Sequence, residues 1–210
     1  MRHSSRAGAA LARLPEVDPA IAALSLWCIY RDTSEAPHSA GDTIYFGPEF
    51  PGLPLSEQTG GLAQHVLHVA LRHSGRRAAA RQRYGARFRG RLYDLACDAL
   101  VNEARLQGKH ALPRPAVRAA ELVERLPGQE RFDNVLAEWD SDRLYAALAE
   151  ASGTGDDEGA VERYAAAQGF EPDLKDSDPE NTEPEEWTGR DEEPMRAGQK
   201  AGSGGAAGTA

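Results

Sequence analysis

Residues 64–73 read QHVLHVALRH, and three of the six histidines of the chain fall within this stretch. Apolar residues in and around the segment recur three and four positions apart, which predicts a largely buried amphipathic helix. Positions three or four apart share one face of a helix, so His65 and His68 project together, with Gln64 one turn from His68. Buried imidazoles need partners for their nitrogens, and a divalent metal ion is one such partner.

The stretch comes close to the metallopeptidase signature His-Glu-x-x-His, in which two histidines bind zinc and the glutamate acts as general base. If His68 is the second histidine, Gln64 occupies the first ligand position and His65 occupies the position of the glutamate. The competing interpretation is a core helix whose histidines form hydrogen bonds with the backbone. The residues alone leave both interpretations open.

A second strong helix is predicted between Phe88 and Gly108, where apolar residues again recur at helical spacing. Within it Asp94, Asp98 and Asn102 follow one another every four residues and form a polar stripe. One interpretation of this stripe is a solvent-exposed edge. That interpretation is weaker for Asp98, because apolar residues flank it on both sides.

The remaining elements are mostly helical. A first helix is expected to begin at the N-cap Asp18 and to end near Arg31. Residues 42–46 read DTIYF and predict a short strand or half-hairpin. The histidine-bearing helix is expected to end near residues 74–75. Further helices are predicted at about residues 116–126, 130–139, 142–151 and 158–168. The pattern indicates an α+β domain that is mostly α-helical.

The chain has 210 residues, of which 40% are hydrophobic, and a mean hydropathy of −0.56. Residues beyond Phe170 are rich in Asp, Glu, Pro and Ser and then in Gly and Ala. Such a composition buries too little apolar surface to offset the entropy of ordering. We therefore expect a flexible N-terminus at residues 1–14, a folded domain at 15–170 and a disordered tail at 171–210.

The net charge of −9 conceals an asymmetry, because residues 72–91 carry eight arginines and no acidic residue. Clustered arginines raise a nucleic-acid-binding hypothesis. A solvated surface is the favoured interpretation, since only Tyr84 and Phe88 offer rings for stacking and the acidic tail competes for the same arginines. Nucleic acid is therefore disfavoured as a partner.

Two further features bear on the compartment of the protein. The longest apolar run, residues 20–30, is too short to span a bilayer and lacks the flank of a signal peptide. Cys28 and Cys97 lie within apolar helical patterns and suit reduced core residues. We expect a cytoplasmic protein without a membrane segment.

Three blocks, at residues 42–50, 64–73 and 92–102, occur in an order and spacing that resemble a known family. It is the putative metallopeptidase domain found in predicted metal-dependent bacterial peptidases, N-terminal to a von Willebrand factor A-like domain. The likeness covers about residues 15 to 150. It implies a zincin-like fold, with an active-site helix under a small sheet inside a mostly helical body.

Carried over residue by residue, the resemblance implies that His68 is the second histidine ligand and that Asp98 is the acid that completes the site. Gln64 and His65 depart from the family pattern, because glutamine is a poor zinc ligand and histidine lacks the general-base carboxylate. Either zinc shifts to His65 and His68 with Asp98 as third ligand, or the domain binds no metal and keeps the scaffold alone. His73 is a further metal-site residue that supports the ligands or caps the helix.

Two functional hypotheses follow from the resemblance. The first is a zinc-dependent peptidase that acts on a peptide or protein substrate, with His65 or Asp94 as catalytic base. The alternative is a catalytically inactive metallopeptidase-like scaffold that acts as a protein-interaction module. Because an acidic segment follows where the family usually continues into the von Willebrand factor A-like domain, we expect a truncated or stand-alone version.

Overall fold

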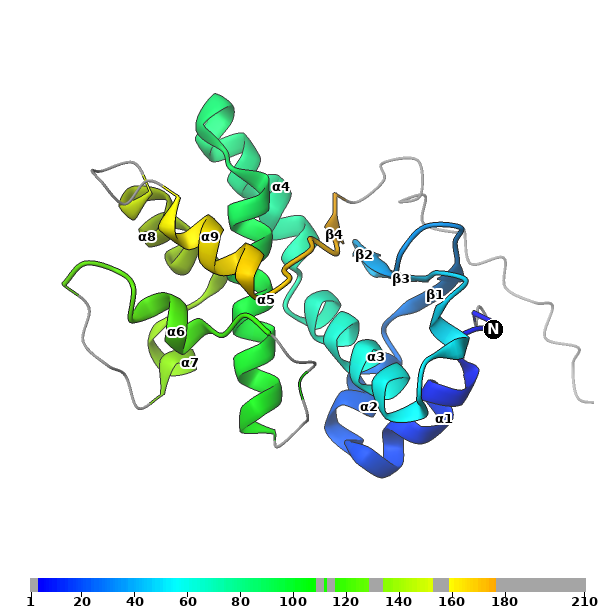
Figure 1. Ribbon diagram of the computed structural model, residues 1–210. Coiled ribbons are helices and arrows are strands. Elements are labelled where there is room, and N and C mark those ends of the chain that lie inside the picture. The colour runs from blue at the N-terminus through cyan, green and yellow to red at the C-terminus, as the bar shows by residue number, and fades with distance from the viewer. Residues whose placement is uncertain (1–3, 109–111, 113–115, 129–133, 153–158, 177–210) are drawn as a thin grey trace, which may run out of the picture.

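A computed structural model describes residues 4–108, 112, 116–128, 134–152 and 159–176 (Figure 1). The N-terminal helices and strands are α1 (Gly8–Val17), α2 (Pro19–Ser25), β1 (Ile29–Asp32), β2 (His38–Ala40) and β3 (Thr43–Phe46). The central helices are α3 (Leu55–Ala70), α4 (His73–Tyr84) and α5 (Gly90–Gln107), and short 3-10 turns lie at Phe50–Gly52 and Gly85–Arg87. The last elements are α6 (Ala119–Val123), α7 (Val135–Glu138), α8 (Ser141–Ala151), α9 (Ala160–Ala167) and β4 (Leu174–Lys175). The described residues thus confirm a mostly helical fold with a small sheet.

The sheet joins the two ends of the described chain. Its strand order is β1-β3-β2-β4 within the described residues. Strand β3 pairs parallel with β1 and antiparallel with β2, and β4 pairs parallel with β2. Strand β4 lies within the range predicted to be a tail from residue 171, so the folded part extends further than the sequence pattern indicates. Residues 177–210 of that predicted tail lie outside the described residues.

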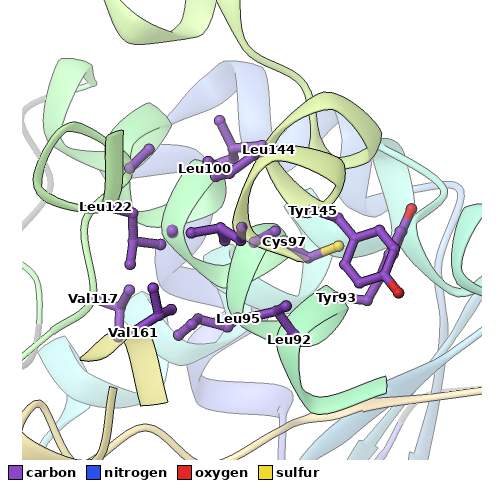
Figure 2. Packing of buried hydrophobic residues seen from close by; sticks show 14 of the residues in the cluster. Leu92, Tyr93, Leu95, Cys97, Leu100, Val117, Leu122, Leu144, Tyr145 and Val161 are labelled. Carbon is purple, nitrogen blue, oxygen red and sulfur yellow. The ribbon is translucent and has the colours of Figure 1, made fainter. Parts of the chain in front are cut away.

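Two apolar clusters lie on either side of the α3–α5 contact. One packs α1, α2 and α3 with the sheet, around the buried residues Leu14, Ile44, Phe46, Leu62 and Val66. The other surrounds α5 and includes residues of α6, α8 and α9 (Figure 2). Helices α3 and α5 contact each other between the two clusters. Polar groups along that contact are therefore enclosed by apolar packing on both sides.

The N-terminal segment is folded from Ser4 onward, in contrast to the flexible N-terminus predicted for residues 1–14. Ala10 and Leu14 are buried on one face of α1, which packs against α3. The Arg6 guanidinium donates a hydrogen bond of 2.7 Å to the carbonyl of Phe46. The apolar face of α1 is short and is buried only by packing against the rest of the folded chain. The local sequence pattern therefore does not indicate that this helix is folded.

The helix predicted from Asp18 to Arg31 ends earlier, at Ser25, although Asp18 does cap it as expected. Ile29 and Tyr30 belong instead to β1, where Tyr30 pairs with Ile44 of β3. This part of the prediction was wrong because pairing with a distant strand overrides a helical apolar pattern.

The histidine-bearing helix also ends earlier than predicted, at Ala70. Arg72 adopts a left-handed conformation with φ of 56°, and this residue separates α3 from α4. His73 therefore begins a new helix, which continues through the arginine-rich segment. The structure has the four predicted C-terminal helices as α6 to α9, with residues 130–133 of the second outside the described residues. No helix in the described ranges combines the length and hydropathy needed to cross a membrane.

Candidate metal centre

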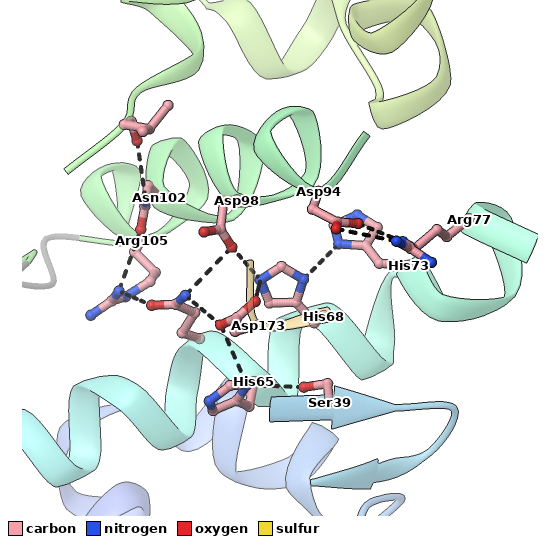
Figure 3. A network of polar contacts seen from close by, with 12 residues as sticks. Ser39, His65, His68, His73, Arg77, Asp94, Asp98, Asn102, Arg105 and Asp173 are labelled. Atoms are coloured by element: carbon pink, nitrogen blue, oxygen red, sulfur yellow. Dashed lines mark hydrogen bonds and ion pairs between the residues drawn. The ribbon is translucent and has the colours of Figure 1, made fainter. Parts of the chain in front are cut away.

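The polar residues of interest converge from three segments (Figure 3). Helix α3 supplies Gln64, His65 and His68, and α5 supplies Asp98. The short segment before β4 supplies Asp173, whose carbonyl accepts a 2.9 Å hydrogen bond from the backbone N–H of Ser39 in β2. The sheet thus anchors a residue from the end of the fold beside the two central helices.

His68, Asp98 and Asp173 form a compact group of possible metal ligands. One ligand atom from each residue lies within 4.8 Å of the others. The Nε2 atom of His68 is 3.0 Å from Oδ1 of Asp98 and 4.0 Å from Oδ1 of Asp173. The His68 side chain is fully buried, whereas those of Asp98 and Asp173 are 10% and 18% exposed. Any access to the group from solvent is therefore on the carboxylate side.

The buried Nε2 atom of His68 lacks a hydrogen bond of acceptable geometry. Nε2 of His68 lies within ion-pair distance of Asp98, yet it makes no hydrogen bond of acceptable geometry and is inaccessible to water. Buried polar atoms without such a bond are rare and call for an explanation. A divalent cation coordinated by the nitrogen and the two carboxylates satisfies all three groups, so the residues present fit a metal ion.

The pKa values of Asp98 and His68 also favour a cation at this position. Burial, followed by the neighbouring charge of Asp173, raises the pKa of Asp98 to about 6, although His68 opposes this effect. Burial by itself lowers the pKa of His68, but Asp173 and Asp98 outweigh that effect and the pKa is raised overall. The carboxylates of Asp98 and Asp173 therefore repel each other, and a positive charge between them would reduce that repulsion.

Gln64 connects the two carboxylates. Its side-chain Nε2 donates to Oδ2 of Asp173 at 3.0 Å and to Oδ1 of Asp98 at 3.5 Å. Its Oε1 accepts a 3.1 Å hydrogen bond from Nη1 of Arg105, a residue buried in α5. A β-carbon at Gly60 would lie 3.0 Å from Nη2 of Arg105, so the glycine leaves room for the guanidinium.

His73 lies behind His68, away from the carboxylates. The two Nδ1 atoms are 3.0 Å apart, so one of them must carry the hydrogen and donate it to the other. Burial, followed by the nearby His68, lowers the pKa of His73 to about 2, which keeps this imidazole neutral. His73 can accordingly accept a hydrogen bond from Nδ1 of His68 and leave the Nε2 lone pair of His68 facing the carboxylates.

His65 lies beside the group and outside the compact set of ligand atoms. Its Nδ1 is 2.9 Å from the hydroxyl of Ser39 and 3.7 Å from Oδ2 of Asp173. Burial lowers the pKa of His65 to about 4, although the charge of Asp173 opposes this effect. His65 is therefore neutral at pH 7.

The stripe Asp94, Asp98 and Asn102 is buried along its whole length, so the interpretation as an exposed edge was wrong. Asp94 pairs with Arg77 through a 2.6 Å contact between Nε and Oδ1. Asn102 donates a 3.0 Å hydrogen bond to the carbonyl of Val117. Only Asp98 of the three belongs to the compact ligand group.

The structure thus brings His68 close to Asp98, the two residues that the resemblance implies as ligands, while His65 lies beside Asp173 and His73 contacts His68. Asp173 was missed. In the sequence it is one acidic residue among many beyond Phe170, and its position in the site depends on the pairing of β4 with β2. The single available signal was Leu174, a large apolar residue next to it in a polar segment.

Comparison with protein families matches residues 2–210 to the family described as a putative metallopeptidase domain. The resemblance drawn from the three sequence blocks is therefore confirmed. Searches of curated proteins and of solved structures find no match to the chain.

Proposed function

Because the chain belongs to the putative metallopeptidase domain family, we propose that it is a metal-dependent hydrolase that cleaves peptide bonds in a peptide or protein substrate. The resemblance implies zinc as the ion and a zincin-like arrangement of α3 under the sheet. The single observation that carries the proposal is the buried Nε2 of His68, which faces two carboxylates without a hydrogen bond of its own.

His68, Asp98 and Asp173 would hold the ion, since one atom of each lies within 4.8 Å of the others. A bound divalent ion would act as a Lewis acid and lower the pKa of a coordinated water. His73 orients His68 by accepting the hydrogen of its Nδ1. Gln64 holds the two carboxylates at a fixed separation.

His65 is the proposed catalytic base, because it occupies the sequence position of the general-base glutamate. Its imidazole is neutral at pH 7, and the nearby carboxylate of Asp173 would stabilise the proton that it accepts from water, against the opposing effect of burial. The other base considered, Asp94, is held by the guanidinium of Arg77. Burial raises the pKa of Asp94 to about 6 against the opposing effect of Arg77, but its carboxylate is engaged by that guanidinium and lies outside the compact ligand group, so we assign it no catalytic role.

The second candidate function is a metal-binding scaffold that interacts with another protein and has no hydrolytic activity. The observation that favours it is the absence of a carboxylate at position 65, where a buried histidine contacts Ser39. Such a protein would keep its metal site for stability alone.

A mixture of defined peptides, incubated with the purified chain and followed by mass spectrometry, separates the two functions. The peptidase proposal predicts cleavage that stops on chelation, returns on addition of a divalent metal and disappears in His68→Ala. His65→Ala should abolish cleavage while metal binding persists, and Arg83→Ala at an exposed position of α4 serves as control. Metal-loaded, folded protein that cleaves none of the peptides would support the scaffold and contradict the peptidase.

A further inference from the structure

We infer that Gln64 sets the metal preference of the centre, shifting it from zinc toward a harder divalent cation such as Mn²⁺. The inference rests on the proposed function, because it concerns the ion bound by His68, Asp98 and Asp173. Gln64 occupies the position of the first histidine ligand in the His-Glu-x-x-His pattern, and the inference gives it a role in determining which ion binds.

Gln64 is held in an orientation that excludes it from the ligand set. Its only lone-pair-bearing side-chain atom, Oε1, accepts from Nη1 of Arg105 at 3.1 Å. Rotation of the amide by half a turn would point its N–H donors at the guanidinium, which offers donors only. The Nε2 group that faces the site has no lone pair to give to a metal. Gln64 therefore contributes hydrogen bonds to Asp98 and Asp173 and no coordinating atom.

The ligands that remain are one imidazole nitrogen and two carboxylate oxygens. Carboxylate oxygens suit hard ions such as Mg²⁺ and Mn²⁺, whereas imidazole suits Zn²⁺. A catalytic zinc site commonly has at least two nitrogen ligands, as in the pair of histidines of the His-Glu-x-x-His helix. Replacement of the first histidine by Gln64 removes one nitrogen ligand and leaves an oxygen-rich set.

Gln64 also stabilises that oxygen-rich set in the absence of metal. Its Nε2 group approaches an oxygen of each carboxylate, at 3.0 Å and 3.5 Å. These donors offset part of the electrostatic repulsion between the two carboxylates. The carboxylates are thereby kept at a spacing suited to a shared cation, so the glutamine organises the oxygen ligands although it does not bind the ion.

Zinc generally binds more tightly than manganese to the same ligands, so the preference is measured as the ratio of the two affinities. Titration calorimetry with chelator competition gives the Zn²⁺ and Mn²⁺ affinities of the wild type, Gln64→His and Gln64→Glu. The spectrum of bound Mn²⁺ by electron paramagnetic resonance gives an independent readout. Gln82, exposed on α4, provides matched controls as Gln82→His and Gln82→Glu.

Gln64→His places an imidazole four residues before His68, on the same helix face, and should raise the zinc-to-manganese affinity ratio by on the order of tenfold. Gln64→Glu keeps an acceptor for Arg105 and adds a third carboxylate, so it should lower the ratio by a similar factor. The Gln82 variants should leave the ratio unchanged. If Gln64→His loses its circular dichroism signal, Gln64→Glu alone decides the test.

A ratio that is the same in folded Gln64 variants as in the wild type would overturn the inference while leaving the metal site intact. Failure of the wild type to bind either ion would instead overturn the proposed function on which the inference rests. Metal binding that persists in His68→Ala would also overturn the proposed function, because the ion would then be bound outside the group of His68, Asp98 and Asp173.

Discussion

Nε2 of His68 lies 3.0 Å from Oδ1 of Asp98, although the two residues belong to different helices. This contact forms where α3 and α5 cross between two apolar clusters, so both groups lose most of their hydration. The nitrogen makes no hydrogen bond of acceptable geometry there, and Asp173 approaches it from a third segment. A metal ion is the simplest occupant that compensates all three groups.

Asp173 should be required for metal binding, and a nearby acid should not. In Asp173→Asn one carboxylate charge is lost from the ligand group, so we expect the metal affinity to fall by at least about tenfold. Asp176→Asn is the matched control, because Asp176 pairs with Arg77 and Arg81 instead. Equal affinities of the two variants, measured by calorimetry, would remove Asp173 from the site.

Metal affinity should increase with pH. The pKa of Asp98 is raised to about 6 and the pKa of His68 is raised above its ordinary value of 6.5 in the metal-free protein. Protons held by these groups compete with the ion at low pH and are released as pH rises through both pKa values. Titrations between pH 5 and pH 8 should show this rise, with proton release detected by comparing buffers of different ionisation enthalpy. An affinity independent of pH would argue against both residues as ligands.

His73 should support metal binding without touching the ion. His73→Phe keeps a buried ring and removes the acceptor for Nδ1 of His68, so we expect a 10–100-fold loss of metal affinity. His38→Phe is the control, because His38 is also buried and stacks on Tyr45. A wild-type affinity in His73→Phe would show that this contact does not orient His68.

The N-terminal helix should contribute to the stability of the fold. Leu14 is 1% exposed, and Leu14→Ala should lower the free energy of unfolding by about 2–5 kcal/mol. Val17 on the same helix is 46% exposed, and Val17→Ala should change that free energy by less than about 0.5 kcal/mol. Urea titrations followed by circular dichroism test both values. Indistinguishable midpoints for the two variants would mean that α1 is not part of the core.

The helical body could be predicted from sequence because helix faces repeat locally. The spacing of His65 and His68, and of Asp94 and Asp98, reflects contacts within one helix and needs no knowledge of the rest of the chain. The family was likewise recognised from blocks of adjacent residues, and the comparison confirms it.

The features that could not be predicted from the sequence depend on contacts between residues of different helices and strands. Tyr30 fits a helical pattern but joins β1, because β3 offers a partner strand. Asp173 reaches His68 only because β4 pairs with β2 at Ser39 and Leu174. The orientation of Gln64 depends on Arg105, which lies on another helix. Each of these contacts joins residues that are far apart in the chain.

The most direct test of the central claim is the number of divalent metal ions bound per chain, measured by native mass spectrometry on wild type and on His68→Ala/Asp98→Ala. The account predicts one ion per wild-type chain and none in the folded double variant. A wild type that stays metal-free at saturating zinc and manganese, or a double variant that still binds one ion, would contradict it.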